Sequence, residues 1–268
     1  MNVDNRWYLP DSKAAVAWCK KRNDQEIHCI FDVLGDPASD RTQAQSSVES
    51  YLDCLKAIWD HGLYASISIK PSTLGSMFDP EICTKNAQII CGIANDSGIG
   101  FEIDMEGKAT IDQILDLAQD CQIECGSITV ALQAYLDRTR TDLAIMNEAG
   151  VRVRLVKGAY IGDSTDFSEI QSRMESLAQS QIYRDRPFCI ATHDPDILRW
   201  FRERVETPNP HYELDFLMGL ADRTKVELAS QGWKVGEYVP FGRNEGGYIA
   251  RRERYLTELS SIGRAPLP

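Results

Sequence analysis

The chain has 268 residues, of which 43% are hydrophobic, and a formal net charge of −11 at pH 7. This length suits one large α/β domain, and the acidic balance argues against a nucleic-acid-binding protein, whose surface would carry a basic patch. No apolar run approaches the roughly 18 residues of a membrane-spanning helix, and the first residues lack the apolar segment of a secretory signal. We therefore expect a cytoplasmic protein.

The eight cysteines are scattered through predicted helices and strands, and none belongs to a CxxC pair. This spacing favours buried, reduced thiols over disulfides or a metal site. The four histidines also lack the spacing of metal ligands, so we expect no metal ion. No serine or cysteine lies in a nucleophile-elbow sequence, which argues against acyl transfer.

Residues 1–26 are expected to form a lead-in with one short helix, predicted over 13–21. From residue 27 onward, short apolar segments of strand type alternate with amphipathic segments of helix type. The predicted strands are 27–34, 64–70, 100–105, 127–134, 151–156, 188–192, 212–217 and 235–239. The predicted helices that follow them are 42–60, 80–95, 110–121, 138–149, 167–183, 195–204, 222–231 and 244–259.

Eight such units with short connections are the pattern of a (β/α)₈ TIM-type barrel, here predicted over residues 27–268. A doubly wound sheet is the alternative, but no GxGxxG follows an early strand, which weakens it. In a barrel, the catalytic groups come from the C-terminal ends of the strands and from the loops after them. Those ends are therefore the place to search for a site.

Charged and polar side chains gather at the predicted strand ends. They are Asp36, Lys70, Asp104, Gln133, Arg154, Lys157, Thr192, His193 and Tyr238. Any one of them alone is more often a solvated or capping residue. Arg154, however, lies on the face of its strand that should point into the barrel, where an arginine is costly unless it meets an anion or an electron-rich cofactor. The convergence of these residues on one rim predicts a site.

Arg251 and Arg252 lie near the start of the last predicted helix. Positive charge in that place opposes the helix dipole, and a bound anion would relieve the conflict. Two adjacent guanidinium groups suit a carboxylate held in bidentate fashion. Solvent-facing arginines are the alternative, and Asp36 and Asp104 are available as acidic partners.

Eight segments occur in barrel order: VLGD (33–36), SIK (68–70), EIDME (102–106), LQAY (132–135), RLVKGAY (154–160), ATHD (191–194), YVPFG (238–242) and ARR (250–252). On these segments the chain resembles the proline dehydrogenase family over residues 27 to 256. The resemblance implies a distorted barrel that holds FAD across its C-terminal rim. It also implies FAD-dependent oxidation of L-proline to 1-pyrroline-5-carboxylate in proline catabolism, with electrons passed to a quinone-type acceptor.

The resemblance assigns roles to the matching positions. Lys70, Arg251 and Arg252 would bind the substrate carboxylate. Tyr160, Leu217 and Tyr238 would surround the substrate ring. Asp104 and Arg154 would be the catalytic pair, with Arg154 beside the flavin N5 edge. The expected cofactor contacts are Met105, Gln133, Arg154, Lys157, Gly158, Ala159, Thr192 and His193.

The chain departs from the family at Asp36, where the family usually has a glutamate that gates the site by pairing with the arginine matching Arg251. Because aspartate is one methylene shorter, we expect a looser gate. The segment LDFLMGL (214–220) is a loose match, and Glu253 and Tyr255 also depart from the family pattern. These departures leave the exact substrate open.

Two alternatives to proline oxidation remain open at this point. One is oxidation of another cyclic or tethered imino acid in a biosynthetic pathway, and the other is a barrel that binds ligands without catalysis. No aldehyde dehydrogenase module is recognised, so the expected partners include a separate 1-pyrroline-5-carboxylate dehydrogenase. At most peripheral contact with the inner face of the membrane is expected.

Overall fold

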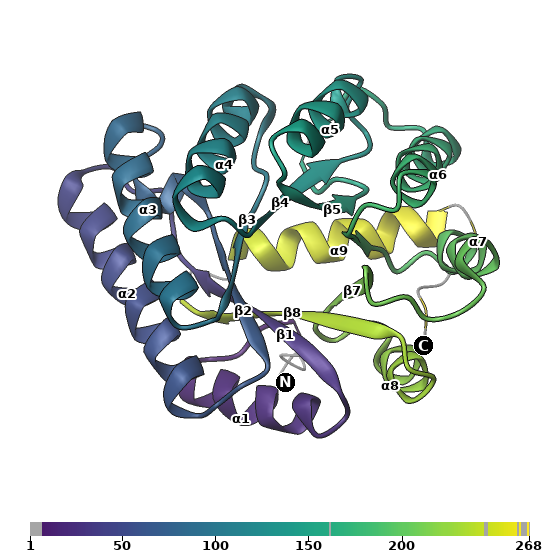
Figure 1. The fold of residues 1–268 in the computed structure, drawn as a ribbon, viewed down its shortest axis with the longest axis horizontal. Helices are drawn as coiled ribbons and strands as arrows, with labels where there is room; N and C mark the ends of the chain where they lie inside the picture. The colour runs from purple at the N-terminus through teal and green to yellow at the C-terminus, as the bar shows by residue number, and fades with distance from the viewer. Residues whose placement is uncertain (1–6, 161, 244–245, 262, 264–266, 268) are drawn as a thin grey trace.

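The structure, a computed structural model, describes residues 7–160, 162–243, 246–261, 263 and 267. Eight parallel strands follow one another around a closed barrel, and the last pairs with the first (Figure 1). The strands are β1 (Ile27–Leu34), β2 (Ala65–Ile69), β3 (Gly100–Ile103), β4 (Ile128–Gln133), β5 (Arg152–Val156), β6 (Phe188–Ala191), β7 (Tyr212–Leu217) and β8 (Lys234–Gly242). The expected (β/α)₈ barrel is confirmed.

The helices surround the barrel and cover one of its ends. Within the described residues they are α1 (Ser12–Asn23), α2 (Arg41–Asp60), α3 (Pro80–Asp96), α4 (Ile111–Cys125), α5 (Thr139–Glu148), α6 (Phe167–Tyr183), α7 (Pro195–Val205), α8 (Asp222–Ser230) and α9 (Gly246–Ser261). Two 3₁₀ turns that the sequence analysis does not predict, η1 (Pro71–Leu74) and η2 (Lys108–Thr110), follow β2 and β3. None of the helices in the described part is long and apolar enough to cross a membrane.

Each strand sends alternate side chains to the outside and the inside of the barrel. In β5, Val153 and Leu155 point outward and are fully buried in the hydrophobic core between strands and helices. Arg154 points inward, where it pairs with acidic side chains from β3 and the loop after it. The outward faces thus build the core, and the inward faces carry the polar groups of the site.

The helix that follows β8 takes an unusual place. In Figure 1, α9 runs across one end of the barrel instead of lying against the outer wall. The lead-in helix α1 packs beside β1 and β8 and so occupies the outer position that α9 leaves free. The barrel is distorted in this sense, and α9 is available to cover the cavity at that end.

The last strand is longer than its predicted range of 235–239. β8 pairs with β1 as far as the register Leu34–Gly242. The lead-in extends this ladder, because the Leu9 N–H donates to the Pro240 carbonyl at 2.9 Å and the Gly242 N–H donates to the Leu9 carbonyl at 3.0 Å. These long-range partners are invisible to local sequence patterns. The predicted start of the last helix, residue 244, lies outside the described residues.

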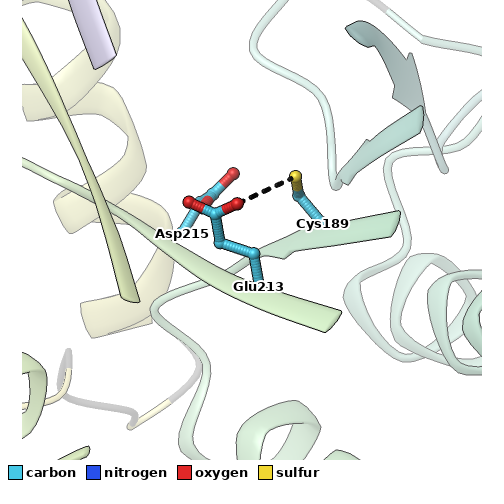
Figure 2. Close-up of side chains that lie close together, drawn as sticks. All are labelled: Cys189, Glu213 and Asp215. Carbon is cyan, nitrogen blue, oxygen red and sulfur yellow. Dashed lines mark hydrogen bonds between the residues drawn. The ribbon is translucent and has the colours of Figure 1, made fainter. Parts of the chain in front are cut away.

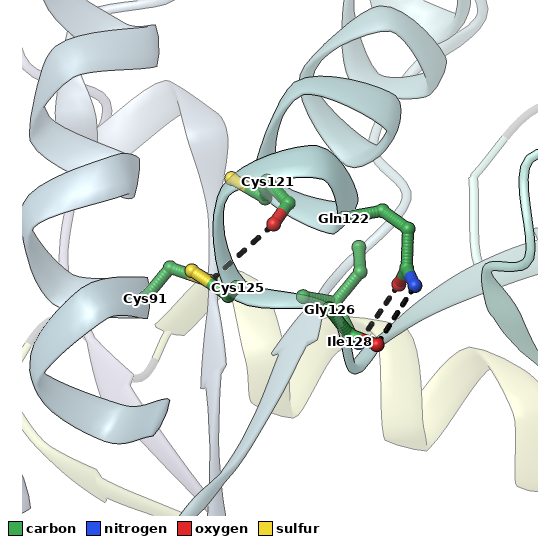
Figure 3. Close-up of a disulfide and its surroundings, with 6 residues drawn as sticks. All are labelled: Cys91, Cys121, Gln122, Cys125, Gly126 and Ile128. Atoms are coloured by element: carbon green, nitrogen blue, oxygen red, sulfur yellow. Dashed lines mark hydrogen bonds between the residues drawn. A yellow bond between two sulfur atoms is a disulfide. The ribbon is translucent and has the colours of Figure 1, made fainter. Parts of the chain in front are cut away.

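One cysteine pair contradicts the expectation of reduced thiols. Cys91 on α3 and Cys125 at the end of α4 form a disulfide, with their Cα atoms 6.4 Å apart (Figure 3). The other six cysteines are buried and free. The expectation is wrong for this pair because the two residues meet only through the packing of α3 on α4, which their sequence separation of 34 residues does not reveal.

A buried ion network ties α1 and α8 to β8. The carboxylate of Glu237 accepts hydrogen bonds from Lys225 Nζ at 2.5 Å and from Trp18 Nε1 at 2.6 Å, and it lies 2.9 Å from Arg22 Nη2. Lys225 and Glu237 are 0% exposed. A carboxylate that is shielded from water in this way depends on its cations.

Replacing Lys225 tests this dependence. We expect Lys225→Met to lower the free energy of unfolding by about 3 kcal/mol, since removing one partner of a buried ion pair costs roughly 3–5 kcal/mol and Arg22 still compensates Glu237. Arg223→Met, which breaks an exposed pair with Glu227 on the same helix, is the control and should cost less than about 1 kcal/mol. Urea unfolding measures both, and equal losses would contradict the ion-network argument.

Candidate active site

A cavity of about 480 Å³ opens at the C-terminal ends of the strands, beneath α9. It gathers every residue that the sequence analysis assigned to the site except Asp36. These are Lys70, Asp104, Met105, Gln133, Arg154, Lys157, Gly158, Ala159, Tyr160, Thr192, His193, Leu217, Tyr238, Arg251 and Arg252. Their shared location follows from the register of parallel strands, whose carboxyl ends all meet at one rim.

Arg154 is held between two carboxylates. Its Nη2 donates to Asp104 Oδ1 at 2.6 Å, and its Nη1 donates to Glu102. Burial alone would favour protonation of Asp104, but the positive charges of Lys70 and Arg154 outweigh burial and lower the pKa of Asp104. The anions that this interior arginine requires are therefore supplied by the protein itself.

A hydrogen-bonded cluster connects β1, β2 and β8 next to this arginine. The Tyr238 hydroxyl donates to Asp104, and Lys70 Nζ donates to the Tyr238 oxygen at 3.2 Å. Lys70 also pairs with Asp32, which lines the cavity. Asp32 is not predicted from the sequence, where its one signal is an acidic residue within the mostly apolar strand 27–34.

Arg251 and Arg252 face the cavity without an ion pair to any carboxylate in the described part of the chain. The Arg251 guanidinium lies 5.2 Å from the ring centre of Tyr160, and that of Arg252 lies 4.9 Å from the ring centre of Tyr248. Arg252 Nε is buried and has no hydrogen-bond partner there. Both guanidinium groups are thus positioned to receive an anion from outside the protein.

The predicted gate residue lies apart from this group. Asp36 is exposed in the loop after β1 and does not line the cavity. It forms no ion pair with Arg251, although both side chains belong to the described residues. A gate formed by this pair stays a prediction.

A hydrogen bond of His193 indicates which ring nitrogen carries the proton, and its surroundings indicate its charge. Its Nε2 accepts from the Leu217 N–H at 2.8 Å, so the ring proton of the neutral form is on Nδ1. Burial, helped by the positive charges of Arg252, Lys225 and Lys157, lowers the pKa of His193 well below its usual value. The side chain is therefore a neutral imidazole with one N–H donor at neutral pH.

Gly158 allows the chain to pass close to an aromatic ring at the rim. It has a φ of 126°, and a Cβ atom at this position would overlap the ring of Tyr135. Only glycine fits both constraints. Gly158 and the neighbouring Ala159 both line the cavity.

Figure 2 shows Cys189, Glu213 and Asp215 close together inside the barrel. One ligand atom from each lies within 4.8 Å of the others. Glu213, however, is engaged by His28 Nδ1 and by Arg152 Nη2, each at 2.9 Å. Burial raises the pKa of Cys189 and keeps it a thiol, and thiols are poor metal ligands. We assign no metal ion to this cluster.

Comparison with protein families gives a match to the model described as proline dehydrogenase, over residues 15–185. The chain belongs to the proline dehydrogenase family. The expected family and enzyme class are confirmed at this level. Proline dehydrogenase 1 of Bacillus subtilis (strain 168) is 28% identical over 247 residues, which cover 90% of this chain and 82% of that protein.

A more distant relative has a different name. The carbapenem antibiotics biosynthesis protein CarD of Pectobacterium carotovorum subsp. carotovorum is 24% identical over 271 residues, which cover 84% of this chain and 71% of that protein.

Solved structures support the fold. The crystal structure of proline utilization A (PutA) from Bdellovibrio bacteriovorus, inactivated by N-propargylglycine, superimposes with a TM-score of 0.82 at 19% identity. PutA from Bradyrhizobium japonicum gives a TM-score of 0.79 at 18% identity. The matches cover 92% and 94% of this proline dehydrogenase family member, which spans about a third of the PutA chains.

Arg154→Met tests how the charges inside the barrel are balanced. Loss of the guanidinium leaves the buried carboxylates under-compensated, so we expect the free energy of unfolding at pH 7 to fall by about 3 kcal/mol or more. In the wild type, Asp104 has a lowered pKa and stabilises the fold above the unfolded-state pKa of about 4. In the variant, burial of Asp104 is no longer opposed by Arg154, so we expect its pKa to rise above that of the unfolded chain. The folded variant then gains stability by taking up a proton as the pH falls from 7 toward 4, and the stability difference between the two proteins should narrow.

Arg154→Lys, which retains the positive charge, is the matched control and should lose less stability than the methionine variant. Chemical unfolding at pH 4, 5, 6 and 7 measures all three proteins. A stability difference between wild type and Arg154→Met that does not change with pH would contradict the ion-pair account.

Proposed function

We propose that this chain catalyses FAD-dependent oxidation of L-proline to 1-pyrroline-5-carboxylate in proline catabolism. The observation that carries the proposal is the pair Arg251 and Arg252, which face the cavity with no described carboxylate partner, opposite the cluster of Lys70, Asp104 and Tyr238. Cations in such a position suit the carboxylate of an amino acid. Family membership supports the same substrate.

The carboxylate of proline would be held by Arg251 and Arg252 from α9, with Lys70 from the end of β2. Lys70 Nζ already has Asp32 and Tyr238 as partners, so the arginines supply the open donors. Tyr160, Leu217 and Tyr238 would surround the ring. Fixing the carboxylate at one end orients the reacting C–H bond at the other, which is mainly a proximity contribution to the rate.

The remaining lining residues fit a flavin. Gly158 and Ala159 line the cavity without bulky side chains, His193 offers its Nδ1–H as a donor, and Arg154 brings a buried positive charge into the cavity. Met105, Gln133, Lys157 and Thr192 are the further residues proposed to hold FAD. The flavin supplies the chemistry of accepting a hydride equivalent. Arg154 would stabilise negative charge that develops in the pocket.

The electron acceptor, the partner enzyme and the location in the cell are proposed from the resemblance to the family. A quinone-type acceptor would take the electrons. A separate 1-pyrroline-5-carboxylate dehydrogenase would consume the product. We propose a cytoplasmic enzyme that contacts the inner face of the membrane at most peripherally.

A second candidate is oxidation of another cyclic or tethered imino acid in a biosynthetic pathway. The similarity to CarD favours this alternative. The higher identity and coverage of the Bacillus subtilis proline dehydrogenase favour proline.

The deciding experiment makes two measurements on the purified protein. A flavin absorption spectrum tests for the cofactor, and turnover of a panel of cyclic imino acids with an artificial electron acceptor ranks the substrates. Highest kcat/KM for L-proline supports the proposal. A clear preference for another imino acid supports the second candidate, and a colourless protein without turnover contradicts both.

The arginine pair gives a first quantitative prediction. We expect Arg251→Ala and Arg252→Ala each to raise KM for proline at least tenfold, equivalent to about 1.4 kcal/mol, because each removes a partner of the substrate carboxylate. Flavin content should stay near that of the wild type. Arg199→Ala on the exposed side of α7 is the control and should leave KM unchanged. An unchanged KM in both Arg251→Ala and Arg252→Ala would mean that these arginines do not bind the substrate.

Tyr238 gives a second prediction. Its ring leaves little room for a hydroxyl on the proline ring, so we expect kcat/KM for proline to exceed that for trans-4-hydroxyproline at least tenfold, and Tyr238→Ser to narrow the ratio. Tyr238→Phe keeps the ring but removes the hydrogen bonds to Asp104 and Lys70. It should change overall activity while keeping the ratio. Equal use of both substrates by the wild type would contradict this assignment.

A further inference from the structure

Asp215 is a carboxyl group inside the barrel that lacks a hydrogen-bond partner. The residue is 2% exposed, and neither side-chain oxygen has a partner among the described residues. It lies on β7 two residues before Leu217 and lines the cavity together with Leu217 and Arg154. Since Leu217 ends the strand, Asp215 lies one layer deeper, beneath the rim. The proposed reaction does not use this residue.

The position opposite this carboxyl on β8 is a glycine. A Cβ atom at Gly236 would lie 2.3 Å from Asp215 Oδ1 and 3.0 Å from Glu213 Oε1. The first distance is shorter than real Cβ contacts allow, so any larger residue would displace the carboxyl. The Asp215 carboxyl thus occupies the space beside Gly236 that a larger residue would fill, and the strands around it leave it little room to move.

The nearby cations are already paired with other carboxylates. Arg152 Nη2 lies 2.9 Å from Glu213 Oε2, and Arg154 is engaged by Glu102 and Asp104. A further buried negative charge would have to share these cations. An unpaired carboxyl in such a place avoids the cost by keeping its proton.

The surrounding charges agree with this description. The titratable and charged groups that face the carboxyl are His28 on β1, Tyr64 just before β2, Glu102 on β3, Arg152 and Arg154 on β5, Cys189 on β6, and Glu213 on its own strand. Burial, followed by the negative charges of Glu213 and Glu102, raises the pKa of Asp215 to about 8, although Arg154 and Arg152 oppose the rise. Asp215 is therefore neutral at pH 7.

We propose that Asp215 is a positioning residue that carries a proton in the working enzyme and so keeps a further negative charge away from Arg154. With Asp215 neutral, the paired interior groups are four carboxylates and three permanent cations. They are Asp32, Glu102, Asp104 and Glu213 with Lys70, Arg152 and Arg154. Ionised Asp215 adds a fifth negative charge close to Arg154.

The inference rests on the proposed function, in which electrons enter the pocket. Extra negative charge beside Arg154 offsets the stabilisation that this arginine gives to incoming negative charge. Asp215 keeps its proton throughout turnover and forms no bond to the substrate. It acts through Arg154, so its loss of a proton should weaken electron acceptance in the pocket.

The proton on Asp215 is tested without any cofactor. The folded protein holds this proton up to about pH 8, whereas the unfolded chain releases it near pH 4. The stability of the wild type therefore falls as the pH rises through this window. Asp215→Asn mimics the neutral carboxyl and removes this dependence.

Urea unfolding between pH 5 and pH 9 measures the effect. We expect the unfolding equilibrium constant of the wild type, divided by that of Asp215→Asn, to rise by up to about tenfold per pH unit below pH 8 and then to level. Asp116→Asn, on the exposed side of α4, is the matched control and should give a flat ratio. A flat ratio for Asp215→Asn would overturn the proposal. If that variant does not fold, carbon-13 NMR titration of the wild-type aspartates decides, and the absence of a carboxyl with a pKa above 6 overturns it.

The action on Arg154 is tested by the midpoint potential of the bound flavin between pH 6 and pH 9. We expect the potential of the wild type to fall more steeply above about pH 8 than that of Asp215→Asn, because only the wild type gains a negative charge there. A purely structural role would not change this slope. Equal slopes in an enzyme that oxidises proline would overturn this inference alone. A protein that binds no flavin would overturn the proposed function as well.

Discussion

Arg154, held between Glu102 and Asp104, is the interaction on which the rest of the site depends. Because the strands of a closed barrel direct every second side chain inward, charged residues from several strands are forced into one small volume. Each of them is tolerable only with a partner of opposite charge. The positions of the charges in the cavity are therefore fixed before any ligand binds, and a ligand must have charges that match them.

The arrangement of the helices makes this charged interior accessible. In many barrels the helix after the eighth strand closes the outer wall, but here α1 lies beside β1 and β8 while α9 crosses the mouth (Figure 1). Arg251 and Arg252 thereby come from above, and Lys70 and Tyr238 from the strand ends below. The cavity thus lies between the strand ends and α9, the last helix described.

Local sequence patterns predict much of this fold. The boundaries of β1, α6 and β7 agree with the ranges 27–34, 167–183 and 212–217, because each combines a clear period with clear start and stop residues. The rim residues were also predictable, since parallel strands bring their carboxyl ends to one edge. Asp32 and Asp215 were not, because both lie within a strand and not at the strand end, where the sequence places the site. The Cys91–Cys125 pair depends on helix packing in the same way.

The contact between Trp18 and Glu237 has a consequence for how the chain acquires its shape. These residues are 219 positions apart, so α1, which also packs on β1, gains this partner only after the last strand has been synthesised. The ladder between β1 and β8 likewise joins the two ends of the chain, which makes barrel closure a late step of high contact order. The first helix thus receives part of its contacts from the strand that is made last.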